Sequence, residues 1–207
     1  MKYNIGTTIA VLAMFVLCLI LAGCSDDPTG PIIDDIPVET DPVLASQDEA
    51  LTHFSDVFES RNLDHYRALL SPEFTFIGKA GADFDHDQEL SIMTKIFTEL
   101  EGDDGVIISN IEVSQLDPQG AWAETSDEDE PFGEYSDSWS RRYEVNIIFY
   151  LQGENTVFLV NGDAVFYLVN SGTAEEPDFK LLGIKDQTIG DKGIENRSLS
   201  GIKELFN

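Results

Sequence analysis

The chain has 207 residues and carries 39 acidic against 12 basic side chains, a formal net charge of −27 at pH 7. This length is enough for one domain with a substantial core. Binding to nucleic acid depends on neutralising phosphates with lysine and arginine, so we expect no nucleic-acid partner and no anionic lipid surface as a partner. The charge is typical of a solvated acidic surface.

The first 23 residues have the features of a secretion signal. Lys2 supplies positive charge near the amino terminus, and residues 9–22 form an unbroken apolar run. This run has the length of the apolar region of a signal peptide and is shorter than the roughly 20 residues that a membrane-spanning helix needs. We therefore expect residues 1–23 to be a signal peptide and the rest of the chain to lie outside the cytoplasm.

The apolar run ends in Leu21-Ala22-Gly23-Cys24, which resembles the lipobox of bacterial lipoproteins. The resemblance implies that Cys24 carries a diacylglyceryl group, becomes the first residue of the mature protein and anchors it in the lipid bilayer of the cell envelope. Two or more acyl chains make such attachment stable. Ser25 is permissive for the outer membrane if the host is Gram-negative. The alternative is an uncleaved N-terminal anchor.

Residues 24–45 are predicted to be a disordered tether, because prolines occur there among Asp, Thr and Gly. These prolines are Pro28, Pro31, Pro37 and Pro42. The chain's two cysteines are Cys18, in the signal, and Cys24. The mature domain, residues 46–207, therefore has no thiol pair for a disulfide and no thiolate metal site. We expect no cofactor.

Three helices and one strand are predicted in the first half of the domain. Ser46 and Glu49 have the spacing of a capping box ahead of a helix, and Asn62 is the expected cap of a short second helix that ends at Pro72. A strand is predicted at 74–77 and a third helix over about 87–100. The expected buried face of this third helix consists of Leu90, Met93, Ile96, Phe97 and Leu100.

The sequence of the second half of the domain predicts a β-sheet. A strand over 106–116 is expected to end in a turn at Asp117-Pro118-Gln119-Gly120, after which Trp122 begins the return. Residues 140–152 alternate between apolar and polar. Residues 156–169 favour one long strand with a bulge or bend over a hairpin, and the last strand is expected over 179–188. This order indicates an α+β fold with N-terminal helices packed on a curved, mainly antiparallel sheet.

Three stretches carry a resemblance to a known family. They are Phe54-x3-Phe58 with Leu63-Asp64-x-Tyr66-x2-Leu69-Leu70-Ser71-Pro72-Glu73-Phe74-Thr75-Phe76, then Phe179-x-Leu181-Leu182-x-Ile184-Lys185-Asp186, and Ser200-Gly201-Ile202-Lys203-Glu204-Leu205-Phe206. The first two resemble the opening helices and the last strand of NTF2-like (SnoaL-like, cystatin-like α+β) domains, and the third resembles the tail of bacterial lipoproteins of this kind. The resemblance implies a cone in which helices and sheet enclose a pocket.

Enzymes of that superfamily place an Asp, His or Tyr inside the cone, and the corresponding candidates here are Tyr66, Tyr143 and Asp186. A pocket carboxylate paired with a hydroxyl donor can catalyse proton transfer on a carbonyl compound. The competing interpretation is structural. Both tyrosines lie on apolar faces and suit a core, and Asp186 lies near a strand end, where a solvated or capping role is expected.

Two acidic stretches are candidates for metal binding. Asp83, Asp85 and Asp87 alternate as at the start of an EF-hand calcium loop, but Gln88 stands where that loop needs glycine. The competing interpretation is an acidic helix amino terminus capped by Asp85. The second stretch, 124–137, is predicted to be a mobile, solvated loop, with weak cation binding or a basic partner as the alternative.

No catalytic motif of the common hydrolases is present in the sequence. We therefore favour a lipid-anchored binding or accessory module whose cone holds a small apolar ligand. The alternatives are an enzyme of the SnoaL or ketosteroid-isomerase type acting on a small carbonyl compound, and an acidic surface protein that associates with Ca²⁺. The resemblance also implies a homodimer formed through the open sheet face.

Overall fold

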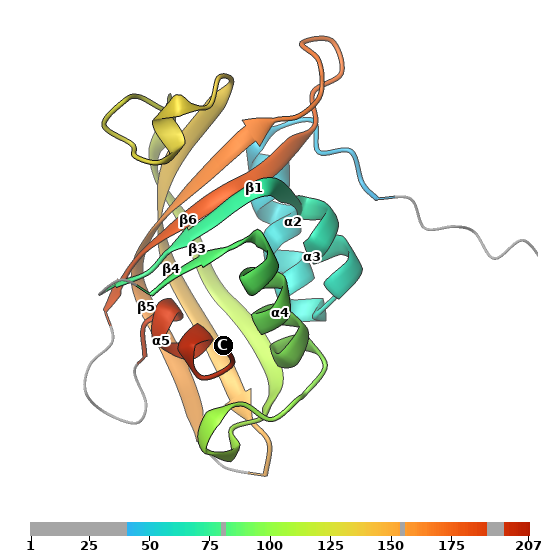
Figure 1. The fold of residues 1–207 in the computed structure, drawn as a ribbon, viewed down its shortest axis with the longest axis vertical. Coiled ribbons are helices and arrows are strands. Elements are labelled where there is room, and N and C mark those ends of the chain that lie inside the picture. Colours follow the sequence, from blue (N-terminus) through green and yellow to red (C-terminus); the bar gives the residue numbers. More distant parts are fainter. Residues whose placement is uncertain (1–40, 80–81, 154–155, 190–196) are drawn as a thin grey trace, which may run out of the picture. The chain divides into compact units, whose positions relative to one another are not determined.

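Two helices open the described part of the chain, two strands and a third helix follow, and four further strands come before a C-terminal helix (Figure 1). The computed structural model describes residues 41–79, 82–153, 156–189 and 197–207. The predicted signal peptide, Cys24 and the tether up to residue 40 lie outside the described residues. The helices among the described residues are α2 (Gln47–Ser60), α3 (Leu63–Leu69), α4 (His86–Phe97) and α5 (Leu199–Glu204), with 3-10 turns η2 (Asp103–Gly105) and η3 (Phe132–Glu134). None of them is long and apolar enough to cross a membrane.

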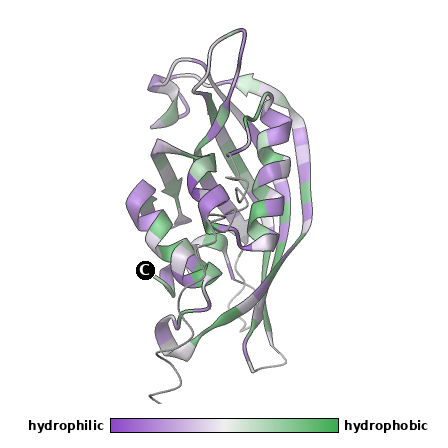
Figure 2. Cartoon of the chain, turned by 90° about the vertical axis from the view of Figure 1, so that its right-hand side faces the viewer, coloured by the Kyte–Doolittle hydropathy of each residue, from purple (hydrophilic) through white to green (hydrophobic). Residues whose placement is uncertain are grey.

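The six strands of the described residues form one sheet in the order β2-β1-β6-β5-β4-β3. Their bounds are β1 (Leu70–Ile77), β2 (Asp83–Asp85), β3 (Ile108–Glu124), β4 (Ser138–Leu151), β5 (Val157–Asn170) and β6 (Phe179–Ile189). All neighbouring pairs are antiparallel except β1 with β6. Figure 2 shows the sheet curving past the helices, which cover one of its faces. The predicted α+β class is thus confirmed, with the element order that the NTF2-like resemblance implied.

Side-chain caps begin the first two helices where the sequence predicts. The Ser46 hydroxyl accepts a hydrogen bond from the Glu49 backbone N–H, and the Asn62 side chain accepts one from the His65 N–H. The Glu49 carboxylate bonds the N–H of Ala45 instead of completing the predicted capping box. α3 ends at Leu69 and β1 starts at once, before the proline that was expected to end the helix.

The buried face of α4 differs from the predicted one. Leu100 lies beyond the helix and is 52% exposed, and Leu90 is only partly buried. Glu89 and Ile92 take their place, each 0% exposed, beside Met93. The prediction counted apolar residues only, and so it missed that a carboxylate belongs to the inward stripe.

The predicted turn at residues 117–120 is wrong. β3 continues through it for 17 residues, and Trp122 lies on the same strand. Pairing with β4 shifts register between Gln119 and Ala123, and Gly120 has a φ of 89°, so the Pro-Gln-Gly segment makes an irregularity and not a return. β3 is an edge strand, and an edge tolerates the missing N–H of Pro118.

The strand over residues 156–169 is confirmed as one strand, β5, which pairs with β4 without a break from Val157 to Val169. Gly162 accommodates a φ of 129° in its middle, a conformation that other residues rarely adopt. The expected last strand is also confirmed as β6. It lies inside the sheet, between β1 and β5, and not at an edge.

The acidic connection between β3 and β4 is not the purely solvated loop that its composition predicts. Phe132 is 1% exposed and stacks on Tyr167, with ring centroids 4.0 Å apart. Together with Leu182 it forms a small second cluster, separate from the main core. A Cβ atom at Gly183 would lie 2.3 Å from the Phe132 ring, so the glycine makes this contact possible. One aromatic residue therefore anchors a strongly charged segment.

Packing begins before the predicted domain boundary. Leu44, in the predicted tether, is 6% exposed. Its N–H donates to the Asp178 carboxylate and its carbonyl accepts from the Phe179 N–H. The described domain thus includes the last residues of the proline-containing segment.

Candidate functional site

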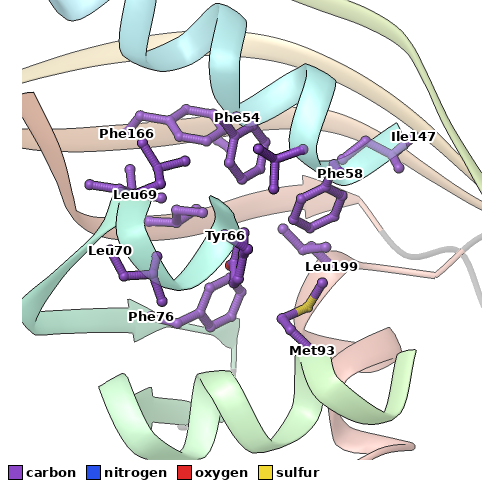
Figure 3. Close-up of a cluster of buried hydrophobic side chains, with 14 of the residues drawn as sticks. Phe54, Phe58, Tyr66, Leu69, Leu70, Phe76, Met93, Ile147, Phe166 and Leu199 are labelled. Atoms are coloured by element: carbon purple, nitrogen blue, oxygen red, sulfur yellow. The ribbon is translucent and has the colours of Figure 1, made fainter. Parts of the chain in front are cut away.

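Aromatic side chains fill the space between the helices and the sheet (Figure 3). The rings of Phe54 and Phe58 on α2 are tilted by 35° with centroids 4.7 Å apart. Each meets a further ring edge-on: Phe54 meets Phe166 of β5, and Phe58 meets Phe97 of α4. All four side chains are buried. The interior of the predicted cone is therefore a packed core at this level.

A polar triad lies within this core, formed by Tyr66, Glu89 and Lys203. The Tyr66 hydroxyl donates to Glu89 Oε1 at 2.6 Å, and Lys203 Nζ lies 2.6 Å from both carboxylate oxygens. The three residues are 0%, 0% and 1% exposed. Because α3, α4 and α5 each supply one member, the triad joins segments that are up to 137 residues apart in the chain.

Burial and proximity shape the electrostatics of the triad. The pKa of Tyr66 is raised well above its usual value, first by burial and then by the neighbouring Glu89 carboxylate. Burial lowers the pKa of Lys203, and the Glu89 carboxylate opposes that change. Lys203 Nζ also lies 3.7 Å from the centroid of the Phe76 ring. A carboxylate that accepts bonds from both an amine and a phenol is poorly placed to take a proton from a substrate.

Asp186 lies on β6 next to this triad but serves the start of α5. Its carboxylate accepts bonds from the N–H and hydroxyl of Thr188 at 2.9 and 2.5 Å, and from the N–H and hydroxyl of Ser200 at 2.8 and 2.7 Å. The side chain is 4% exposed. Asp186 also raises the pKa of Lys203, against the larger effect of burial. The geometry is that of a buried anchor for the C-terminal helix.

Tyr143 lies on β4, apart from the triad. Its ring meets Phe166 edge-on at 5.4 Å, and the Arg141 guanidinium lies 5.4 Å from its centroid. Burial raises the pKa of Tyr143, and the Arg141 charge opposes this. The three sequence candidates are therefore not brought together in one site: Tyr66 bonds Glu89 in the triad, Asp186 bonds Thr188 and Ser200, and Tyr143 borders a separate surface cavity.

Surface cavities lie apart from the triad. One of about 380 Å³ is bordered by the acidic β3–β4 connection and its lining includes Asp127, Glu130 and Glu134. Another of about 330 Å³ lies between α2 and β3, with Tyr143 in its lining. Neither lining includes Tyr66, Glu89 or Lys203.

The predicted oxygen ligands at the start of α4 have structural partners. Asp85 caps the helix, accepting from the Gln88 N–H while the Gln88 side chain accepts from the Asp85 N–H. The predicted cap at Asp85 is thus confirmed, and it takes the form of a capping box. Asp83 accepts from the Gly78 N–H, and Asp87 lies 3.0 Å from the His86 ring nitrogen. Among the described residues, no group of three His, Cys, Asp or Glu could hold a metal ion. Calcium association stays a prediction.

Glu89 and Lys203 were not among the sequence candidates. The sequence nevertheless indicates that Glu89 is buried, because Glu89 lies at helical spacing with Ile92, Met93 and Ile96. A charged residue on an apolar stripe indicates a buried partner. Nothing in the sequence identifies that partner as Lys203, which lies 114 residues further along the chain.

No protein-family model and no curated protein sequence matches the chain. Solved structures with a similar fold include a conserved protein from Planctomyces limnophilus, at 11% identity over 69% of this chain and 92% of that one, with a TM-score of 0.49. An NTF2-like protein of unknown function in nutrient uptake from Rhodospirillum rubrum has 10% identity over 70% and 98%, with a TM-score of 0.46. An NTF2-like superfamily protein from Salmonella enterica has 11% identity over 70% and 89%, with a TM-score of 0.46.

Proposed function

We propose that the chain is an exported lipoprotein, held in the cell envelope through acylated Cys24, whose folded domain is a binding or accessory module. The lipobox supports the anchor, and Ser25 supports the outer membrane in a Gram-negative host. One observation carries the preference for a module over an enzyme. The buried carboxylate of the triad, that of Glu89, is already bonded by Lys203 and Tyr66 within a packed interior.

The proposal changes where a ligand is expected. Phe54, Phe58 and Phe97 occupy the inside of the cone, so an apolar ligand has no described space there. The exposed surfaces remain, and among them the hollow between α2 and β3 is lined by both apolar and polar side chains. A module of this kind would meet its ligand or partner from outside, at a distance from the bilayer set by the residues that follow Cys24.

The anchor is tested by growing a bacterial host that expresses the full chain with an alkyne-tagged fatty acid. We expect the wild-type chain to incorporate the label and to sediment with membranes, and the Cys24→Ser variant to do neither. A Cys18→Ser variant is the matched control, because it removes the other cysteine and should keep the label. Labelling that survives Cys24→Ser would contradict the lipobox assignment.

A second candidate function is an enzyme that moves a proton on a small carbonyl compound. The 2.6 Å bond between the Tyr66 hydroxyl and Glu89 favours it, since a phenol and a carboxylate are the pair that such chemistry uses. Its test is proton–deuterium exchange at the carbon next to the carbonyl of small ketones, followed by NMR in D₂O. Exchange catalysed by the wild type and abolished in Glu89→Gln would establish the enzyme, and exchange equal to that of buffer would exclude it for these ketones.

The homodimer through the open sheet face is likewise a proposal. Sedimentation velocity of the full chain in detergent, over a range of protein concentrations, tests it. A single species with the mass of one chain at every concentration would contradict it.

A further inference from the structure

Polar clamps hold α2 beside the edge strand β3 at two points. Near the start of α2, Asp48 Oδ1 accepts bonds of 2.9 Å from Trp122 Nε1 on β3 and from Arg141 Nη1 on β4. Near its end, Glu59 Oε1 accepts a bond of 2.9 Å from the Val113 N–H on β3. Between these clamps the helix and the strand are not bridged by any hydrogen bond of the described residues. The clamps therefore set a gap of defined width.

This gap is the cavity of about 330 Å³, which we call the α2–β3 window. Its lining consists of Asp48, Leu51, Thr52, Ser55 and Asp56 from α2, Leu116 and Pro118 from β3, and Tyr143 from β4. Leu51 and Tyr143 are each 3% exposed and belong to the main core. The window thus has an apolar base and a polar rim, and its volume lies in the range of small-molecule sites.

The charge of the rim is negative and unbalanced. The lining includes two carboxylates and no cationic side chain. Asp56 is exposed and forms no hydrogen bond or ion pair with any other described residue. The Asp48 side chain is 73% exposed and accepts both of its described bonds at one oxygen, Oδ1. Free carboxylate oxygens therefore face solvent on the rim.

The nearest cation cannot serve an anionic ligand. Arg141 is bound to Asp48, its side chain is only 14% exposed, and its guanidinium lies over the rings of Trp122 and Tyr143 at 5.7 and 5.4 Å. It stiffens the wall of the window and does not line it. The net charge of −27 adds to the repulsion of anions.

We propose that the α2–β3 window binds a small organic cation, with its amine at the Asp56 carboxylate and its apolar part against Leu116, Pro118 and the Tyr143 ring. The Asp56 carboxylate accepts charge-assisted hydrogen bonds, and the hydroxyls of Thr52 and Ser55 supply further acceptors. Asp48 lies about 12 Å away along the helix, so it adds negative charge to the rim without bonding the same amine. The apolar base gives the ligand a hydrophobic group as well as a charge. This inference rests on the proposed binding role and names its site and ligand class.

The test titrates the purified full chain with benzylamine, with benzyl alcohol as the neutral analogue and benzoate as the anion. Binding is followed by NMR at the Trp122 indole N–H, which is bonded to the rim residue Asp48. We expect a saturable shift with benzylamine, affinity about tenfold weaker for benzyl alcohol, and no shift with benzoate. Rising salt should weaken benzylamine binding, because the rim carboxylates are exposed. Equal binding of the amine and the alcohol, or binding of neither, would overturn the proposal.

Two variants place the binding at the window. Asp56→Asn should weaken benzylamine binding severalfold, whereas Asp64→Asn, an exposed carboxylate of α3 outside the window, should leave it unchanged. Thr52→Phe should fill the gap and abolish binding while the protein stays folded, since Thr52 is exposed. Unchanged binding in both Asp56→Asn and Thr52→Phe would sink the assignment. If the wild-type chain is not acylated at Cys24 but still binds benzylamine, the lipid anchor is contradicted and the proposed binding at the α2–β3 window is not.

Discussion

The buried triad and the α2–β3 window contain the same kinds of side chain but differ in whether the carboxylates have partners within the protein. Each combines a tyrosine, carboxylate oxygens and apolar walls. In the triad, Glu89 receives bonds from Lys203 and Tyr66 and is 0% exposed. In the window, Asp56 has no bonded partner among the described residues and faces solvent. The Glu89 carboxylate is bonded by side chains of the protein itself, whereas the Asp56 carboxylate is available to bond a ligand.

This difference shows that residue type alone does not make a site. A buried carboxylate without a cation would be too costly to keep, so the fold supplies Lys203 and thereby removes the group from chemistry. An exposed carboxylate loses little by having no partner, because water solvates it. The interior triad is therefore expected to matter for stability and the window for binding.

Lys203→Met should have the largest effect on stability, because it leaves the Glu89 carboxylate buried without its cation. We expect a loss of about 3–5 kcal/mol in the free energy of unfolding, measured by urea denaturation. The double variant Glu89→Gln with Lys203→Met should recover a large part of this loss, since no charge is then left unpaired. A loss in Lys203→Met below about 1 kcal/mol would mean that water reaches Glu89 and that the interior is not closed.

Tyr66→Phe should cost less, about 1–3 kcal/mol, because Glu89 keeps both bonds to Lys203 when the hydroxyl is removed. The same urea denaturation measures it. Tyr143→Phe is the matched control on the window side, where no hydrogen bond from the Tyr143 hydroxyl to a carboxylate is described. Equal losses in the two variants would erase the distinction between the two regions.

Alkaline pH should reveal the burial of Tyr66. Burial raises the pKa of Tyr66 well above its usual value near 10, so between pH 10 and the raised pKa the unfolded chain releases this proton while the folded chain keeps it. The unfolded state then binds fewer protons, and stability falls as pH rises. Unfolding free energies measured from pH 8 to 12 should fall less steeply in Tyr66→Phe than in the wild type. Identical slopes would contradict a buried phenol.

Asp48→Asn weakens one clamp of the window and should cost at most about 1 kcal/mol, since the Asp48 side chain is 73% exposed. Its clearer effect should be on motion. Hydrogen exchange of the Trp122 indole N–H should speed up, while the Val113 N–H, held by Glu59 at the other clamp, should keep its rate. Faster exchange at both positions would show that the clamps are not independent.

Asp56→Asn should have the smallest effect on stability, within about 0.5 kcal/mol, because its carboxylate makes no bond to other described residues. Thermal unfolding measures it, with Asp64→Asn as the control. A marked loss of stability would mean that Asp56 has a structural role and is not free for a ligand.

The sequence by itself determined the features that depend on neighbouring residues. Ser46 and Asn62 cap their helices because a side-chain oxygen reaches a backbone N–H three residues away. The alternation along β4, with Tyr143, Val145 and Ile147 turned inward, follows from the two-residue period of a strand. From such local signals the α+β class and most elements could be predicted, and Tyr66 could be named as a candidate.

Only the tertiary structure decided what depends on residues far apart in the chain. Pro118 and Gly120 have the composition of a turn, yet β3 runs through them because it lies at the sheet edge and pairs with β4 on one side only. Glu89 meets Lys203 across 114 residues, a contact set by how α5 packs and not by any local pattern. Local rules act over a few residues, whereas the pairing of buried charges and the width of the α2–β3 window are settled when the layers come together.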